Sequence, residues 1–252
     1  MDMLLIITIL VVIFALGFDF INGFHDTANA IATSVSTRAL KPRVAVMMAA
    51  VMNFVGAITF VGVAKAIASD IVDPFSLNGF EGDTTGSIVI LAALCSAITW
   101  NLLTWYYGIP SSSSHTLIGS IAGAAIASAG FGILNYEGFL KILQALIFSP
   151  IIALVIGFSM MKLFKFLFKN FSLYSTNKGF RLVQIATAAI QSFTHGTNDA
   201  QKAMGIITMA LIAANMQSGD EVQDWVRVAC ALAMGLGTAV GGYKIIKTVG
   251  GK

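Results

Sequence analysis

Polar side chains interrupt the first long apolar run of this chain. Within GFDFINGFHDTANAIAT, residues 17–33, there are five of them: Asp19, Asn22, His25, Asp26 and Asn29. On a helix, the spacings of 3, 4 and 3 between Asp19, Asn22, Asp26 and Asn29 place these four on one face. Charged groups in apolar surroundings are costly unless they are paired or hydrated. This polar seam is therefore predicted to bind an ion or to carry protons, or else to hold helices together through ion pairs.

The same pattern occurs a second time in the chain. FINGFHDTANA at 20–30 aligns without a gap with FTHGTNDAQKA at 193–203, an offset of 173 residues. Polar positions match polar positions, and four aligned pairs are identical: Phe20 and Phe193, Gly23 and Gly196, Asp26 and Asp199, Ala30 and Ala203. The second seam consists of Ser192, His195, Asp199 and Lys202. Two related seams predict two halves of one site, with a structural ion pair between an aspartate and Lys202 as the alternative.

The composition is that of an integral membrane protein. Of 252 residues, 57% are hydrophobic and only 11% are charged, whereas about a quarter of the residues in a soluble domain are charged. Apolar runs near or above the roughly 18–20 residues that cross a bilayer recur at 3–21, 44–68, 87–107, 115–134, 139–161, 183–213 and 224–243. We therefore predict an all-α, multi-spanning bundle. The net charge of +3 is too small to indicate a nucleic-acid partner.

Basic residues indicate the orientation of the two copies. Loops 35–43 and 162–181 are rich in Lys and Arg and are predicted to be cytoplasmic, as is the basic tail after 243, while loops 69–86 and 215–227 are predicted outside. The two seams then run in opposite directions. An inverted repeat with an interrupted apolar segment in each half is typical of secondary transporters with a midplane site. About 33 helical residues would extend about 50 Å, so each copy must either tilt strongly or break, and we expect broken helices, with the breaks at Asn22–Gly23 and His195–Gly196.

A serine-rich stretch, GIPSSSSHTLIGS at 108–120, lies between two apolar runs. Pro110 ends the first run, and four serines stand where the next helix begins. A helix start with unpaired N–H groups and hydroxyl donors is a ready anion site. Two topologies fit the predicted loops: three spans, or a re-entrant hairpin formed by 87–107 and the residues up to 131, followed by one span. We favour the hairpin, because irregular backbone at membrane depth is tolerated where protein encloses it.

Other classes of function fit the residues less well. A hydrolase could use Ser113, His115 and either Asp26 or Asp199, but no Gly-x-Ser-x-Gly turn is present. A metal site formed by the three histidines would lack a His-Glu-x-x-His motif or a cysteine pair. A non-catalytic scaffold would leave the buried aspartates unexplained. We therefore expect no enzyme activity and no resident metal.

Three motifs carry a resemblance to a known family. FINGFHDTANA, WNLLTWYYGIPSSSSHTLIGS and FTHGTNDAQKAMGI together closely resemble the Pit-type inorganic phosphate transporters, especially the bacterial members, over essentially the whole chain. The resemblance implies a multi-pass protein of the inner membrane that moves phosphate with a coupling cation through two inverted repeats. It implies a phosphate site formed by Asp26, Ser112, Ser113, Ser114, Thr116, Asn198 and Asp199. It implies a site for the coupling ion or proton formed by His25, Asp26, Asn29, His115, His195, Asp199 and Lys202.

Departures from the family pattern bear on the coupling ion. His25 stands where many relatives have Asn, and Gln201 and Lys202 stand where many have a second Asn. Since a sodium site needs neutral or anionic oxygen ligands, we expect H⁺ rather than Na⁺, with no other cofactor. A metal–phosphate complex is a second form that the cargo could take. Sulfate is the alternative substrate, because hydroxyl and N–H donors barely distinguish it from phosphate, and a homodimer is a possible assembly.

The domain organisation follows from the repeat. We predict a first repeat over 1–161, a short basic cytoplasmic linker over 162–181, and the start of a second inverted repeat over 182–252. The family continues into a second Ser/Thr-His hairpin, for which this chain has no counterpart. The sequence is therefore expected to be C-terminally truncated.

Overall fold

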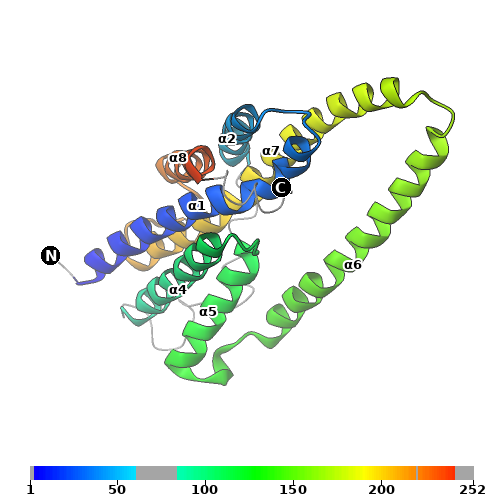
Figure 1. Cartoon of the computed structure of the whole chain (residues 1–252). Coiled ribbons are helices and arrows are strands. Elements are labelled where there is room, and N and C mark those ends of the chain that lie inside the picture. Colours follow the sequence, from blue (N-terminus) through cyan, green and yellow to red (C-terminus); the bar gives the residue numbers. More distant parts are fainter. Residues whose placement is uncertain (1–2, 61–83, 220, 242–252) are drawn as a thin grey trace.

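The computed structural model describes residues 3–60, 84–219 and 221–241. Its helices are α1 (Met3–Ser36), α2 (Pro42–Thr59), α4 (Thr85–Tyr107), α5 (Ser113–Ala129), α6 (Tyr136–Leu167), α7 (Leu173–Ala213) and α8 (Asp224–Gly241), with a 3₁₀ turn η1 (Phe131–Ile133) (Figure 1). No strand occurs in the described ranges. Helices α1, α2, α4 and α6 are long and apolar enough to cross a membrane. The prediction of an all-α, multi-spanning membrane protein is confirmed.

The two copies of the polar seam lie on α1 and α7, which pack together at the centre of the bundle (Figure 1). Each of these two helices packs against the helix that follows the other copy. Helix α2 follows the first copy and packs against α7, and α8 follows the second copy and packs against α1. A buried apolar cluster joins these helices to α4, with Phe18, Leu94, Met204 and Met234 among its fully buried members. Each half of the repeat therefore depends on the other half for its packing.

The expected breaks in α1 and α7 are wrong for this structure. Both helices run without interruption, α1 through Gly23 and α7 through Gly196. The two glycines serve close helix packing instead. A Cβ at Gly23 would collide with the carbonyl oxygen of Met234 in α8, and a Cβ at Gly196 with that of Asn53 in α2. Since 34 residues of α1 extend about 51 Å, the helix must tilt or project beyond the hydrocarbon core.

Helices α4 and α5 form an antiparallel hairpin whose tip lies beside the middle of α1 and α7 (Figure 1). Gly108 ends α4 in the left-handed region at φ 68°, where it donates its N–H to the last turn. Ser112 caps α5, because its hydroxyl accepts a hydrogen bond from the His115 N–H. Ser113, the first residue of α5, is buried and contacts Asp26 of α1 and Asp199 of α7, an arrangement that agrees with the re-entrant hairpin.

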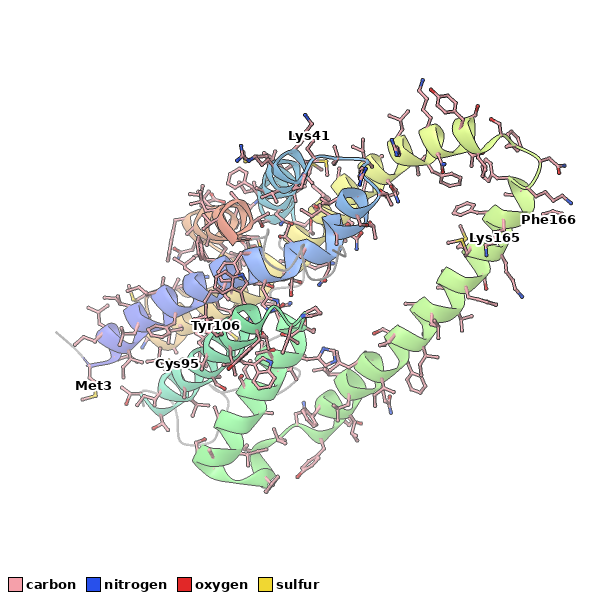
Figure 2. All side chains as sticks on the ribbon, viewed as in Figure 1. Met3, Lys41, Cys95, Tyr106, Lys165 and Phe166 are labelled. Carbon is pink, nitrogen blue, oxygen red and sulfur yellow. The ribbon has the colours of Figure 1, made fainter. Side chains whose placement is uncertain are left out.

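Helix α6 stands apart from the other helices. Of its 32 residues only Gly138 is buried, and Figure 2 shows the side chains of Lys165 and Phe166 near its far end, away from the bundle. Within the predicted linker over 162–181, α6 continues to Leu167 and α7 begins at Leu173, which leaves 168–172 as the non-helical connection. Predictions for most of loop 69–86, for the end of run 44–68 and for the basic tail lie outside the described residues.

Candidate functional site

Two carboxylates and an imidazole meet where the two copies face each other. Three possible ligand atoms lie within 4.8 Å of one another: one carboxylate oxygen of Asp26, one carboxylate oxygen of Asp199 and one ring nitrogen of His195. The aspartates occupy aligned positions of α1 and α7, and both have little exposed surface. Three acceptor atoms at this spacing repel one another in a low-dielectric interior. They are close enough to share one proton or one small cation.

Hydrogen-bond donors from both copies and from the hairpin converge on Asp199. Its Oδ2 atom accepts hydrogen bonds from the Asn22 amide at 2.9 Å and the Ser113 hydroxyl at 3.2 Å. The Lys202 ammonium group lies 3.0 Å from the same oxygen and donates to the Ser114 hydroxyl at 2.7 Å. The pairing of Lys202 with an aspartate is therefore made within α7, and it also ties the hairpin tip to that helix.

Asp26 has a different set of partners. Its Oδ2 atom accepts a 3.4 Å hydrogen bond from the Ser113 backbone N–H, and its Oδ1 atom lies 3.0 Å from Nδ1 of His25. The other ring nitrogen of His25 lies 3.0 Å from the Thr104 hydroxyl, which donates its own proton to the Trp100 or Asn101 carbonyl in α4. Nε2 of His25 therefore carries a hydrogen, and a proton must also lie between Nδ1 and Asp26.

Comparison with known proteins places this chain in a family. A family model described as "Phosphate transporter family" matches residues 22–252. This chain belongs to the phosphate transporter family. The resemblance drawn from the three motifs is confirmed, and so is the expectation of a membrane transporter rather than an enzyme.

Named members of the phosphate transporter family align along most of the chain. A probable low-affinity inorganic phosphate transporter of Bacillus subtilis (strain 168) is 70% identical over 253 residues, which cover 100% of this chain and 74% of that protein. A protein of the same description from Rhizobium meliloti (strain 1021) is 43% identical and covers 94% of this chain and 70% of its own length. A solved structure titled "The sodium-dependent phosphate transporter" matches with a TM-score of 0.80 at 24% identity over 97% of this chain and 78% of its own. The last comparison shows a shared fold.

Several residues that the phosphate transporter motifs implicated lie away from the carboxylates. Asn29 and Asn198 are exposed, and neither side chain hydrogen-bonds a described residue. Ser112 and His115 are also exposed and pair with each other, Ser112 Oγ to His115 Nδ1, at 2.8 Å. Thr116 donates to the Ser112 carbonyl oxygen. Of the hairpin residues, Ser113 and Ser114 are the ones that contact Asp26, Asp199 or Lys202.

Sequence reasoning missed two buried partners of the histidines. Thr104 in α4 contacts His25, and Asn53 in α2 lies with its Oδ1 atom 3.1 Å from Nδ1 of His195. Asn53 is a lone amide within an apolar run, and that is the signal that could have drawn attention to it. Thr104 shares its run with Thr99 and Asn101, so its position gives no comparable signal. Asp19, whose role the sequence leaves open, is fully buried beside the thiol of Cys230.

Proposed function

We propose that the protein is a secondary active symporter that moves inorganic phosphate across the cell membrane together with protons. The observation that carries this proposal is the cluster of donors at the hairpin tip. Four donor groups lie where the carboxylates of the two copies meet: the Ser113 N–H, the Ser113 hydroxyl, the Ser114 hydroxyl and the Lys202 ammonium group. Such donors suit a tetrahedral oxyanion, and the family supplies phosphate as the substrate.

Competition for these donors explains why phosphate would need a coupling cation. The carboxylates of Asp26 and Asp199 already accept hydrogen bonds from the Ser113 N–H and hydroxyl. Phosphate requires the same donors and would be repelled by the two negative charges. A cation that neutralises the carboxylates releases the donors and removes the repulsion. Phosphate and cation therefore bind cooperatively, and each raises the affinity for the other.

The geometry favours a proton as that cation. His25 and Asp26 share a hydrogen bond between Nδ1 and Oδ1 at 3.0 Å, which makes this pair suited to hold the coupling proton. The ammonium group of Lys202, 3.0 Å from Asp199, would repel a sodium ion at the same carboxylate. A divalent metal that enters with phosphate would neutralise the same charges, so a metal–phosphate complex is a second form of the cargo.

We expect labelled phosphate to enter cells that lack other phosphate carriers when an inward proton gradient is imposed without sodium. A protonophore should stop this uptake, because it dissipates the gradient, whereas a sodium gradient alone should not drive it. Strict dependence on sodium would contradict proton coupling. Excess sulfate should leave uptake unchanged. Equal competition by sulfate would instead indicate a general oxyanion carrier.

Replacing Ser113 by alanine is expected to raise the KM for phosphate about 10- to 100-fold. The side chain of Ser113 is buried and its hydroxyl contacts Asp199 and Lys202, and a hydrogen bond to a charged group contributes roughly 1.5–3 kcal/mol. Concentration-dependent uptake measures the change. Ser128→Ala is the matched control, because that hydroxyl donates to the Ala125 carbonyl at the far end of α5. Equal KM values for the two variants would exclude Ser113 from the site.

A further inference from the structure

Asn53 links His195 to the packing of the two halves. It lies in α2, which follows the first copy, and has no exposed surface. Its Oδ1 atom is 3.1 Å from Nδ1 of His195 in α7. Its Nδ2 atom donates to the hydroxyls of Thr27 in α1 and Thr238 in α8 at 3.0 and 2.9 Å. One amide side chain thus connects all four helices that carry or flank the copies.

The surrounding hydroxyls determine which way the Asn53 amide points. Thr27 donates to the Gly23 carbonyl oxygen, and Thr238 donates to that oxygen or to the Met234 carbonyl oxygen, so both hydroxyl oxygens remain as acceptors for the two N–H groups of Asn53. In the reversed orientation Asn53 would have two N–H groups facing one nitrogen of His195. One N–H of a fully buried amide would then have no acceptor, which costs about 1–3 kcal/mol. The observed orientation pairs every polar hydrogen of Asn53.

This orientation fixes the tautomer of His195. Because Oδ1 of Asn53 can only accept, Nδ1 of a neutral His195 ring must carry the hydrogen. Nε2 then presents a lone pair. It lies 3.6 Å from Oδ2 of Asp199 and is buried without a hydrogen-bond donor among the described residues. Two acceptors that face each other at this distance leave room for a cation between them.

We propose that Asn53 is a positioning residue that holds His195 as the Nδ1–H tautomer and thereby aims the Nε2 lone pair at the coupling cation beside Asp199. The role in coupling rests on the proposed symport, whereas the fixed tautomer does not. The charged groups nearest Nε2 are Asp199 and Lys202 of α7 and Asp26 of α1. Two further titratable groups of α1 act on these: His25 contacts Asp26, and Asp19 interacts electrostatically with Asp199 and Lys202. Helix α4 carries no acid or base, His115 of α5 faces outward, and the charges of α2 and α8 lie in their first turns, at Arg43, Asp224 and Arg227.

The tautomer of His195 can be measured by NMR, and the assignment is simple because the chain has only three histidines. In ¹⁵N-histidine-labelled protein, the His195 signals are assigned by their loss in His195→Gln. In the wild type, we expect Nδ1 of His195 to show the ¹⁵N chemical shift of a ring nitrogen that carries a hydrogen. Asn53→Leu should move the hydrogen to Nε2, where the Asp199 carboxylate accepts it. Asn53→Asp keeps an acceptor at Nδ1 and should restore the wild-type tautomer. The control Thr104→Val, beside His25, should leave His195 unchanged.

Two spectroscopic results would overturn the proposal: an Nε2–H tautomer in the wild type, or an unchanged tautomer in Asn53→Leu. The wild-type spectrum decides the matter even if the leucine variant does not fold. In transport, Asn53→Leu should require a roughly three- to tenfold higher proton concentration for half-maximal phosphate uptake, as expected for the loss of one hydrogen bond. An unchanged pH profile of phosphate uptake in Asn53→Leu would mean that Asn53 has no role in proton coupling. If the wild type carries no phosphate under any cation gradient, the proposed symport fails while the tautomer assignment stands.

Discussion

Phosphate uptake is expected to fall by more than about 100-fold when either Asp26 or Asp199 is replaced by asparagine. Asparagine has the same shape but carries no charge to be neutralised, so the cation loses its site. Each variant also weakens more than one charge-assisted hydrogen bond, at roughly 1.5–3 kcal/mol each. For Asp199 these bonds come from Asn22, Ser113 and Lys202. Initial rates of proton-driven uptake, corrected for the amount of protein in the membrane, measure the effect.

The matched control for both aspartates is Asp224→Asn. Asp224 lies at the start of α8 with a 94% exposed side chain and pairs with Arg227 at 3.2 Å. A surface pair of this kind contributes at most about 1 kcal/mol, so uptake should remain at the wild-type rate. Uptake at a normal rate by Asp26→Asn or Asp199→Asn would contradict both the proposed site and the proposed competition between carboxylates and phosphate.

The sequence predicts the centre of this site better than its periphery. Asp26 and Asp199 stand out because the same residue recurs at one offset within two apolar runs. The four consecutive serines do not indicate by themselves which of them contacts the carboxylates. Ser112 caps α5, while Ser113, one residue later, contacts the carboxylates. Which serine faces inward depends on how the hairpin enters the bundle, and the local sequence does not contain that information.

Long-range packing also explains why helix breaks were expected and not found. A glycine beside a polar residue within an apolar run is compatible with a broken helix or with close helix contact. The deciding neighbour of Gly23 is Met234, in a helix of the other half. Asn53 was missed for a similar reason, because its partners Thr27, His195 and Thr238 lie in three other helices.

One added methyl group at Gly23 or Gly196 is expected to separate the two halves. In each case the new Cβ would overlap a backbone carbonyl oxygen of the crossing helix, Met234 for Gly23 and Asn53 for Gly196. Backbone cannot move aside as a flexible side chain can, so Gly23→Ala and Gly196→Ala should each cost at least roughly 1–3 kcal/mol. The midpoint of thermal unfolding of the purified protein in detergent measures the loss, and Gly196→Ala should also disturb His195 by displacing Asn53.

The hairpin supplies the control for these two substitutions. Gly119 and Gly123 lie within α5, and a Cβ at either position would meet nothing within 4 Å. Because alanine favours a helix over glycine by about 1 kcal/mol, Gly119→Ala and Gly123→Ala should leave the unfolding midpoint unchanged or raise it. Equal destabilisation by all four substitutions would mean that the methyl group acts through something other than the close crossings. Destabilisation confined to Gly23 and Gly196 would show that equivalent glycines join the two inverted halves around their shared carboxylates.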